Sequence, residues 1–256
     1  IISMKKVKKL IVGNWKMNPV EEYKARDIVK QVKRASDKLK RSEVVICPPY
    51  LYVPLFSKAK GKNFKIGSQN AHHELSGSFT GEVSFSQLYQ FGIRFVIVGH
   101  SERRKMGETD EMVNNKVKSV VNSGMTAIIC VGESTRDTNG DYLDLIKNQI
   151  RNALNDVPKK LLGSIVIAYE PIWAIGAKEA MSGRDLHEMS IYIKKVLNDT
   201  FGFVSEDVRI IYGGSVDKVN ADTLIQEGNV SGFLVGRQSL VPKDFIEIMK
   251  LVDNVK

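Results

Sequence analysis

The chain has few cysteines and no long apolar segment. Its two cysteines, Cys47 and Cys130, each lie within or at the end of a short apolar run of this 256-residue sequence. Two such thiols do not make the disulfide framework of small secreted domains, so we expect reduced cysteines and a cytoplasmic protein. No apolar run is long enough for a membrane span or for the core of a signal peptide. We therefore expect no membrane association.

Metal and cofactor motifs are also missing. Of the four histidines, His72 and His73 are adjacent, a spacing that sends two ligands in different directions, and they fall in a polar segment typical of a surface or an interface. The sequence has no G-x-S-x-G nucleophile motif. After the first apolar run Gly13 stands alone, without the further glycines of a dinucleotide-binding turn. We expect no metal and no cofactor.

Acidic residues are outnumbered, 38 Lys and Arg against 29 Asp and Glu, which gives a net charge of +9. Such an excess could serve nucleic acid, an acidic surface or a small anionic substrate. Most of it lies in scattered basic residues of predicted helices without interleaved aromatic residues, which favours a solvated helix face and predicts no nucleic-acid groove. A barrel that only binds phosphate or nucleic acid stays as the alternative to an enzyme. Examples of these basic residues are Lys30, Lys33, Arg34, Lys38, Lys40 and Arg41.

The pattern along the chain is a strand followed by a helix, eight times. Short apolar, β-branched runs predict strands at 10–13, 44–47, 64–67, 95–99, 127–131, 165–169, 209–212 and 232–236. The intervening segments predict helices at 20–39, 110–123, 142–155, 185–200 and 217–227, with shorter ones at 50–60, 84–91 and 242–252. Continuously apolar strands alternating with helices indicate a parallel sheet covered by helices.

Eight such units in about 250 residues favour a closed (β/α)8 barrel, the TIM barrel of the α/β class, over an open doubly wound sheet. No linker interrupts the pattern, so we expect a single domain over residues 1–256. Met4 is the expected natural start, with residues 1–3 a remnant that precedes it.

Polar residues that follow the strands form a ring in such a barrel, where its chemistry lies. Asn14 and Lys16 follow the first strand and offer an amide and a fixed positive charge, although Lys16 could simply be solvated. His100 follows the fourth strand. It could be a buried structural histidine, or a neutral proton donor favoured by the amides of the next helical turn.

The sixth strand ends on a carboxylate, Glu170, and continues into an apolar loop at 172–176 that closes with Gly176. A loop of this kind can cover the carboxylate and exclude water, so Glu170 is a candidate base under a lid. The alternative is an ordinary buried strand end with a capping glutamate.

Glycine turns follow the last two strands, at Tyr212-Gly213-Gly214-Ser215 and at Gly236-Arg237. Glycine turns expose backbone N–H groups to an anion, although tight turns use glycine for other reasons as well. Together with Lys16 and Gly176 they favour a phosphorylated substrate. A base, a histidine, a cation and an anion cradle suit proton abstraction beside a carbonyl.

Five segments in order along the chain resemble the triosephosphate isomerase family. The resemblance implies interconversion of dihydroxyacetone phosphate and glyceraldehyde 3-phosphate in glycolysis and gluconeogenesis, by a homodimer without a cofactor. GHSERR and YEPIWAIG are the most specific of the five. The segments are NWKMN at 14–18, GHSERR at 99–104, YEPIWAIG at 169–176, YGGSV at 212–216 and GFLVG at 232–236.

The resemblance also implies a role for each residue of the ring. Glu170 would be the base that moves the proton, and His100 the neutral electrophile that polarises the carbonyl. Lys16 and Asn14 would stabilise the enediolate and its phosphate, and Glu102 would orient Lys16 or relay protons. Backbone N–H groups for the phosphate would come from Gly176, Ser215, Gly236 and Arg237, with Tyr212 and Ser215 latching the lid.

The segment 69–84 is similar to the family's dimer loop, which reaches into the neighbouring subunit. Thr80 would then support Asn14 of the partner subunit, and Glu82 could pair with Arg103 across the interface.

Three departures from the family pattern affect these expectations. Arg237 stands where the family usually has a second glycine; it can still donate its N–H, but its side chain could alter the cradle or itself face the phosphate. The far end of the lid reads Ala177-Lys178-Glu179, so lid opening could differ in rate. The turn after the paired arginines, 104–108, is one residue shorter, which we expect to affect a surface helix start.

Overall fold

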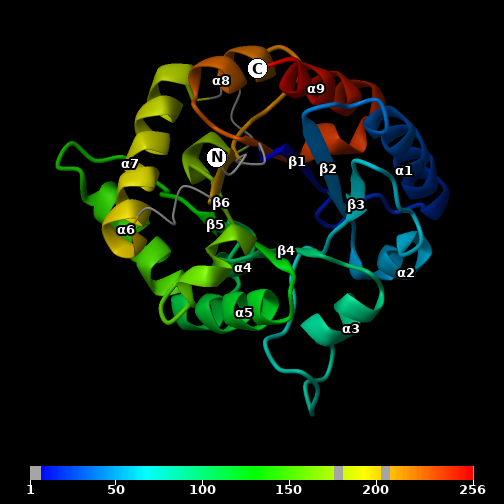
Figure 1. Cartoon of the computed structure of the whole chain (residues 1–256), viewed down its shortest axis with the longest axis horizontal. Helices are drawn as coiled ribbons and strands as arrows, with labels where there is room; N and C mark the ends of the chain where they lie inside the picture. Colours follow the sequence, from blue (N-terminus) through cyan, green and yellow to red (C-terminus); the bar gives the residue numbers. More distant parts are fainter. Residues whose placement is uncertain (1–6, 176–180, 203–207, 256) are drawn as a thin grey trace, which may run out of the picture.

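The computed structural model describes residues 7–175, 181–202 and 208–255. Expectations for Met4, Gly176 and the Ala177-Lys178-Glu179 hinge lie outside the described residues. Eight parallel strands form the centre of the molecule, ringed by helices (Figure 1). The strands are β1 (Lys9–Asn14), β2 (Ser42–Cys47), β3 (Phe64–Ile66), β4 (Phe95–Val98), β5 (Thr126–Val131), β6 (Ile165–Tyr169), β7 (Arg209–Tyr212) and β8 (Gly232–Val235).

The sheet is closed by one residue after β3. The strands follow the order β3-β2-β1-β8-β7-β6-β5-β4, which leaves β3 and β4 as the two ends. Ser68 joins them: its N–H donates to the carbonyl of Phe95 at 2.8 Å, and its carbonyl accepts from the N–H of Ile97 at 2.9 Å. The predicted (β/α)8 barrel is confirmed, and the open doubly wound sheet is excluded.

The strands are continuously apolar because both of their faces are buried. Along β1, Leu10 and Val12 belong to the cluster inside the barrel, whereas Ile11 belongs to the cluster between the barrel and its helices. Neighbouring residues of a strand point to opposite faces, so each strand supplies both clusters. The inner cluster comprises Leu10, Val12, Val45, Cys47, Phe95, Ile97, Ile128, Cys130, Val166, Ala168, Ile211 and Leu234.

The helices agree with the expected positions, with differences at their ends. The described α-helices are α1 (Glu22–Ser36), α2 (Val53–Phe56), α3 (Phe85–Gln90), α4 (Ser101–Lys105), α5 (Asp110–Asn122), α6 (Asp141–Ala153), α7 (Gly183–Phe201), α8 (Ala221–Glu227) and α9 (Pro242–Asn254). Short 3-10 helices are η1 (Tyr50–Tyr52), η2 (Lys159–Ser164), η3 (Ile172–Ala174) and η5 (Arg237–Leu240). None of the described helices is long and apolar enough to cross a membrane.

The helix expected at 217–227 begins later, at Ala221. The carboxylate of Asp217 accepts hydrogen bonds from the N–H groups of Val219 and Asn220, at 2.7 and 2.9 Å. Aspartate commonly forms such turns with backbone two residues on, in competition with a helix. Residues 217–220 are therefore a turn.

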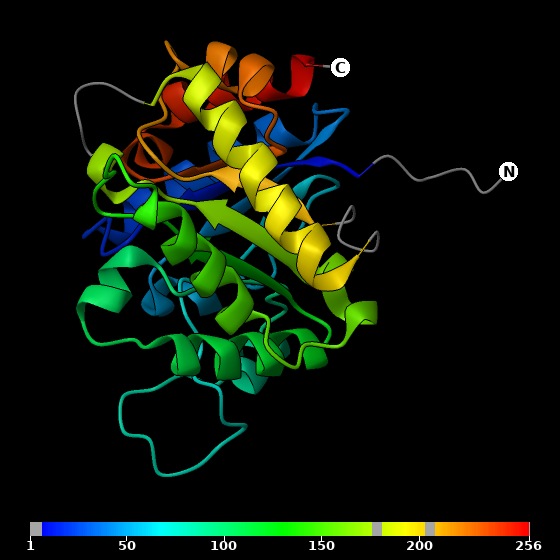
Figure 2. The ribbon, with the colours of Figure 1, turned by 90° about the vertical axis from the view of Figure 1, so that its left-hand side faces the viewer.

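Between β3 and α3 the chain leaves the barrel and projects as a long loop (Figure 2). The expected dimer loop thus stands clear of the helical ring (Figure 2).

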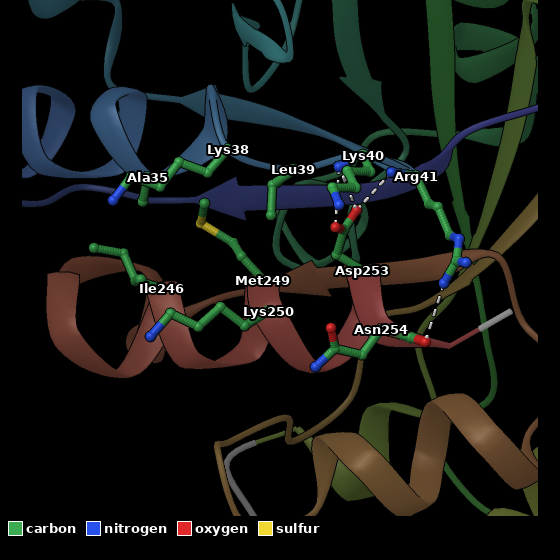
Figure 3. Close-up of a pocket in the computed structure, with 10 residues that line it drawn as sticks. All are labelled: Ala35, Lys38, Leu39, Lys40, Arg41, Ile246, Met249, Lys250, Asp253 and Asn254. Carbon is green, nitrogen blue, oxygen red and sulfur yellow. Dashed lines mark hydrogen bonds between the residues drawn. The ribbon is translucent and has the colours of Figure 1, made fainter.

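Helices α1 and α9 close the ring where the chain's first and last units meet. The carboxylate of Asp253 accepts from the N–H groups of Lys40 and Arg41, its shortest contact being 2.7 Å to Arg41 (Figure 3). The guanidinium of Arg41 donates to the carbonyl of Asn254 at 3.3 Å. These contacts fix the end of α9 against the segment that leads into β2.

Replacing Asp253 by Ala should lower the free energy of unfolding by about 1–2 kcal/mol, because two backbone donors lose their acceptor. Burial alone would raise the pKa of Asp253, but the N–H groups of Lys40 and Arg41 lower it below its ordinary value. The contribution is therefore present above the carboxyl's unfolded-state pKa and lost as the pH falls through the lower folded-state value. Urea denaturation at neutral and acid pH measures both effects.

The matched control is Glu247→Ala, which removes an exposed carboxylate from the same helix. It should change stability by less than about 0.5 kcal/mol. Equal effects of the two substitutions would contradict the structural role of Asp253.

Candidate active site

A cavity of about 420 Å³ lies at the ends of the strands, where the expected ring was placed. It is bordered by Asn14 and Lys16 after β1, His100 after β4 and Glu170 after β6, together with the turns after β7 and β8. A larger hollow of about 580 Å³, between α1 and α9, lies beside the segment that precedes β2, away from these strand ends (Figure 3). Of the predicted residues the cavity brings together Asn14, Lys16, His100, Glu170, Ser215, Gly236 and Arg237.

Glu170 and His100 face each other in this cavity. The carboxylate Oε1 of Glu170 lies 3.3 Å from Nε2 of His100, and its Oε2 accepts from the N–H of Ser101 at 3.5 Å. Glu170 is only 2% exposed. A buried carboxylate needs donors to offset the loss of water, and these two provide them.

The hydrogen bond at the other ring nitrogen of His100 determines which nitrogen carries the proton. Nδ1 accepts a hydrogen bond from the N–H of Glu102 at 3.2 Å, within the first turn of α4. An imidazole nitrogen that accepts carries no proton. His100 is therefore neutral with its proton on Nε2, the nitrogen that faces Glu170 and the cavity.

Lys16 reaches the cavity from a strained backbone position. Its φ is +53°, in the left-handed region, and its N–H donates to the side-chain oxygen of Asn14 at 3.1 Å. The amide of Gln69 donates to the carbonyl of Lys16 at 2.8 Å. The ammonium of Lys16 lies 2.6 Å from Oε1 of Glu102. Because both side chains are substantially exposed, this ion pair orients Lys16 and adds little to stability.

Two glycines are required by the close approach of Glu170. A Cβ on Gly213 would lie 2.7 Å from Cγ of Glu170, and one on Gly132 would lie 1.9 Å from the carbonyl oxygen of Glu170. The glycine turns after β5 and β7 thus allow the loops on either side to hold the carboxylate in place.

The turn after β8 does not need the second glycine of the family pattern. Arg237 begins the 3-10 helix η5 and has no positive φ. Any L-residue can adopt this conformation, so the side chain of Arg237 leaves the backbone of the turn unstrained. Lys16 lies nearby: a Cβ on Gly236 would be 3.9 Å from its Cε.

Tyr212 and Glu102 border the ring without lining the cavity. The Tyr212 hydroxyl lies over Gly214, where a Cβ would be 2.1 Å from it, and faces the backbone of Met181. Burial raises the pKa of Tyr212 to about 12, so its hydroxyl remains a donor. Glu102 reaches the cavity through Lys16.

Sequence reasoning missed the buried carboxylate of Glu133, in the loop after β5. Its Oε1 accepts from the hydroxyl of Tyr169 at 2.9 Å, from Nε1 of Trp173 at 3.0 Å and from Nε of Arg136 at 3.0 Å. Arg136 also donates to the Tyr169 hydroxyl at 3.0 Å and lies 5.4 Å from the centre of the Trp173 ring. This Glu133 cluster holds the residues on either side of Glu170.

A second missed group lies behind His100. Glu108 is buried, its carboxylate pairs with Lys116, and it accepts from the N–H of Gly99 at 3.1 Å. Lys116 also donates to the side-chain oxygen of Asn70 at 2.8 Å. Glu108 lies in the shortened 104–108 turn, and its carboxylate turns inward to bond the end of β4.

Cys130, expected to be buried and reduced, is a free thiol beside the base. Burial, and then the charge of Glu170, raise the pKa of Cys130 well above its ordinary value. The thiol is therefore protonated and unreactive. His72 and His73 stack on each other at 4.6 Å, and no group of three or more potential metal ligands occurs among the described residues.

Comparison with known proteins places this site in one family. The family model described as triosephosphate isomerase matches residues 9–252, which include all eight strands. The triosephosphate isomerase of Alkaliphilus oremlandii is 41% identical over 246 residues, covering 94% of this chain and 98% of the relative. Those of Natranaerobius thermophilus and Idiomarina loihiensis are each 39% identical, over 94% and 93% of this chain and 95% and 96% of the relative.

Replacing Arg136 by Met should lower the free energy of unfolding by about 3 kcal/mol, because the buried carboxylate of Glu133 loses its cationic partner. The double variant Glu133→Gln with Arg136→Met should recover part of this loss, since no charge is then left unpaired. Chemical denaturation of the two single variants and the double variant measures the coupling.

Arg184→Met is the control, because Arg184 forms an exposed ion pair with Glu188. A loss at Arg136 no greater than at Arg184, or no recovery in the double variant, would contradict the role of the cluster.

Proposed function

Since this chain belongs to the triosephosphate isomerase family and interconverts triose phosphates, we propose that Glu170 moves the proton between the two substrate carbons. The reaction is the glycolytic interconversion of dihydroxyacetone phosphate and glyceraldehyde 3-phosphate, run in reverse in gluconeogenesis. The observation that carries this assignment is the buried Glu170–His100 pair at 3.3 Å in the cavity. A carboxylate removed from water beside a neutral donor is poised for general base catalysis.

His100 donates from Nε2 to the substrate carbonyl and stabilises the enediolate that forms. Because Nδ1 accepts a hydrogen bond from Glu102, Nε2 is the nitrogen that carries the proton. A neutral imidazole keeps this N–H as a hydrogen-bond donor, so it polarises the carbonyl without first giving up its proton. The family is itself a standard example of a glutamate base beside a neutral histidine.

Lys16 and Asn14 stabilise the negative charge of the enediolate and its phosphate. Both side chains border the cavity, and Glu102 positions the ammonium of Lys16. An ammonium near the developing oxyanion lowers the barrier because it is already oriented before the reaction. The proposed reaction uses no metal and no cofactor.

The phosphate is held by backbone N–H groups of Ser215, Gly236 and Arg237, which border the same cavity. Gly176 would contribute another, although it lies outside the described residues. The segment 172–176 serves as the lid, and Tyr212 and Ser215 latch it when closed. Closure keeps water from an intermediate that would otherwise expel its phosphate.

The chain acts as a homodimer in which the projecting loop enters the partner subunit. A second hollow of about 210 Å³ borders the other side of Asn14, Lys16 and His100, and includes Arg103. Met17 and Met106 at its edge are 90% and 80% exposed, a large apolar surface for a soluble protein. Thr80, an exposed residue of the loop, fits this hollow beside Asn14, and Glu82 reaches Arg103.

We further assign the chain to the cytoplasm as a single domain. Both cysteines are buried free thiols, as a reducing compartment permits. Nucleic acid is not a proposed partner, since the basic residues of α1 are not interleaved with aromatic residues and Arg26 pairs with Glu22 on the same helix.

Replacing Glu170 by Gln should lower kcat by at least ~10² to 10⁴, because the amide cannot accept the proton. The substitution keeps the size of the side chain and its contact with Gly213, so the fold should be retained. A coupled assay of dihydroxyacetone phosphate conversion, with circular dichroism as the folding control, measures both. Near-normal turnover by the folded variant would overturn the mechanism.

Replacing Thr80 by Arg should convert the dimer to monomers and lower activity, because the larger charged side chain does not fit the partner's hollow. Analytical ultracentrifugation over a concentration series measures the dissociation. Thr138→Arg, the same change at an exposed position in another loop, is the control. If the two variants sediment alike, Thr80 does not lie in the interface.

A further inference from the structure

The cavity contains one cation whose charge no described residue neutralises. Lys16 is paired with Glu102 at 2.6 Å. The carboxylate of Asp217, which also borders the cavity, is occupied by the N–H groups of Val219 and Asn220. Arg237 borders the cavity too, and among the described residues no carboxylate lies within ion-pair distance of its guanidinium. Its positive charge is therefore available to a ligand.

The position of Arg237 is compatible with a second function for its side chain. Its backbone begins η5 without strain, so the position of its N–H group places no restriction on the guanidinium. The side chain is exposed, on the solvent side of the turn. It lies next to Gly236, whose backbone approaches the Lys16 side chain. Arg237 and Lys16 thus both border the region where the phosphate is proposed to lie.

We propose that the guanidinium of Arg237 is a further substrate-binding group, which contacts the phosphate from the solvent side in addition to the backbone N–H donors. A guanidinium is charged at every physiological pH, and its planar donors match two phosphate oxygens at once. This inference rests on the proposed function, since it takes the position of the phosphate from it.

Two consequences follow from this contact. The phosphate does not change during the reaction, so Arg237 binds substrate and transition state alike and acts on KM with kcat unchanged. An uncompensated cation at the mouth of the cavity also attracts dianions before they bind, an effect that salt screens. Inorganic phosphate, which shares the charged group of the substrate, should respond in the same way.

The test compares Arg237→Gln and Arg237→Lys with the unaltered protein. Arg237→Gln should raise KM for the triose phosphate, and the inhibition constant of inorganic phosphate, by roughly tenfold, with kcat within about twofold. Arg237→Lys keeps the charge without the planar donors, so its KM and inhibition constant should lie between those of Arg237→Gln and the unaltered protein. The fall of kcat/KM with added salt should be less steep for Arg237→Gln. Lys243→Gln removes an exposed cation outside the cavity lining and should leave these values unchanged.

Unchanged KM and phosphate inhibition in Arg237→Gln would overturn the inference, as would a fall in kcat with KM preserved. Should Arg237→Gln fail to fold, Arg237→Gly gives the same comparison with the family's usual residue. Failure of the proposed function itself would show separately, as normal turnover by the folded Glu170→Gln variant, whatever the Arg237 variants do.

Discussion

The geometry of the candidate site depends on keeping one carboxylate, that of Glu170, buried and in place. Removing a charged carboxylate from water is costly, and Nε2 of His100 and the N–H of Ser101 face its oxygens at 3.3 and 3.5 Å. Both donors come from the end of β4, which is separated from β6 in the sheet by β5 alone. The pairing of β4, β5 and β6 brings them to Glu170, and Ser68 holds β4 from its other side through the hydrogen bonds that close the sheet. The pairing of these strands and the reactive pair are thus one constraint.

That constraint explains which parts of the fold the sequence could predict. All eight strands and the positions of Asn14, Lys16, His100 and Glu170 follow from apolar runs and from the residues that succeed them. These patterns are local, and the closed barrel places the residues that follow successive strands around one ring. The dimer loop, the phosphate donors and the latch stay predictions, because they involve a partner subunit, a substrate or residues outside the described part.

The Glu133 cluster and Glu108 escaped prediction for the opposite reason. Glu133 and Arg136 lie after β5, whereas Tyr169 ends β6 and Trp173 follows Glu170, so the cluster exists only once the two strands pair. Glu108 looks like a surface residue in a charged segment, and only folding brings Lys116 and the N–H of Gly99 to it. The available signal was an isolated Glu directly after the Gly132 turn, too common to be specific.

The Glu133 cluster also fixes the start of the loop after β6. The 3-10 helix η3 is held by two hydrogen bonds to Glu133. Nε1 of Trp173 donates to its carboxylate, and the N–H of Ile172 donates to its carbonyl at 2.8 Å. A hydrogen bond to a charged acceptor contributes more than one between neutral groups, so displacing η3 would require an exchange of these donors. The same carboxylate holds Tyr169, the residue before the base. Glu133 therefore fixes the chain on both sides of Glu170.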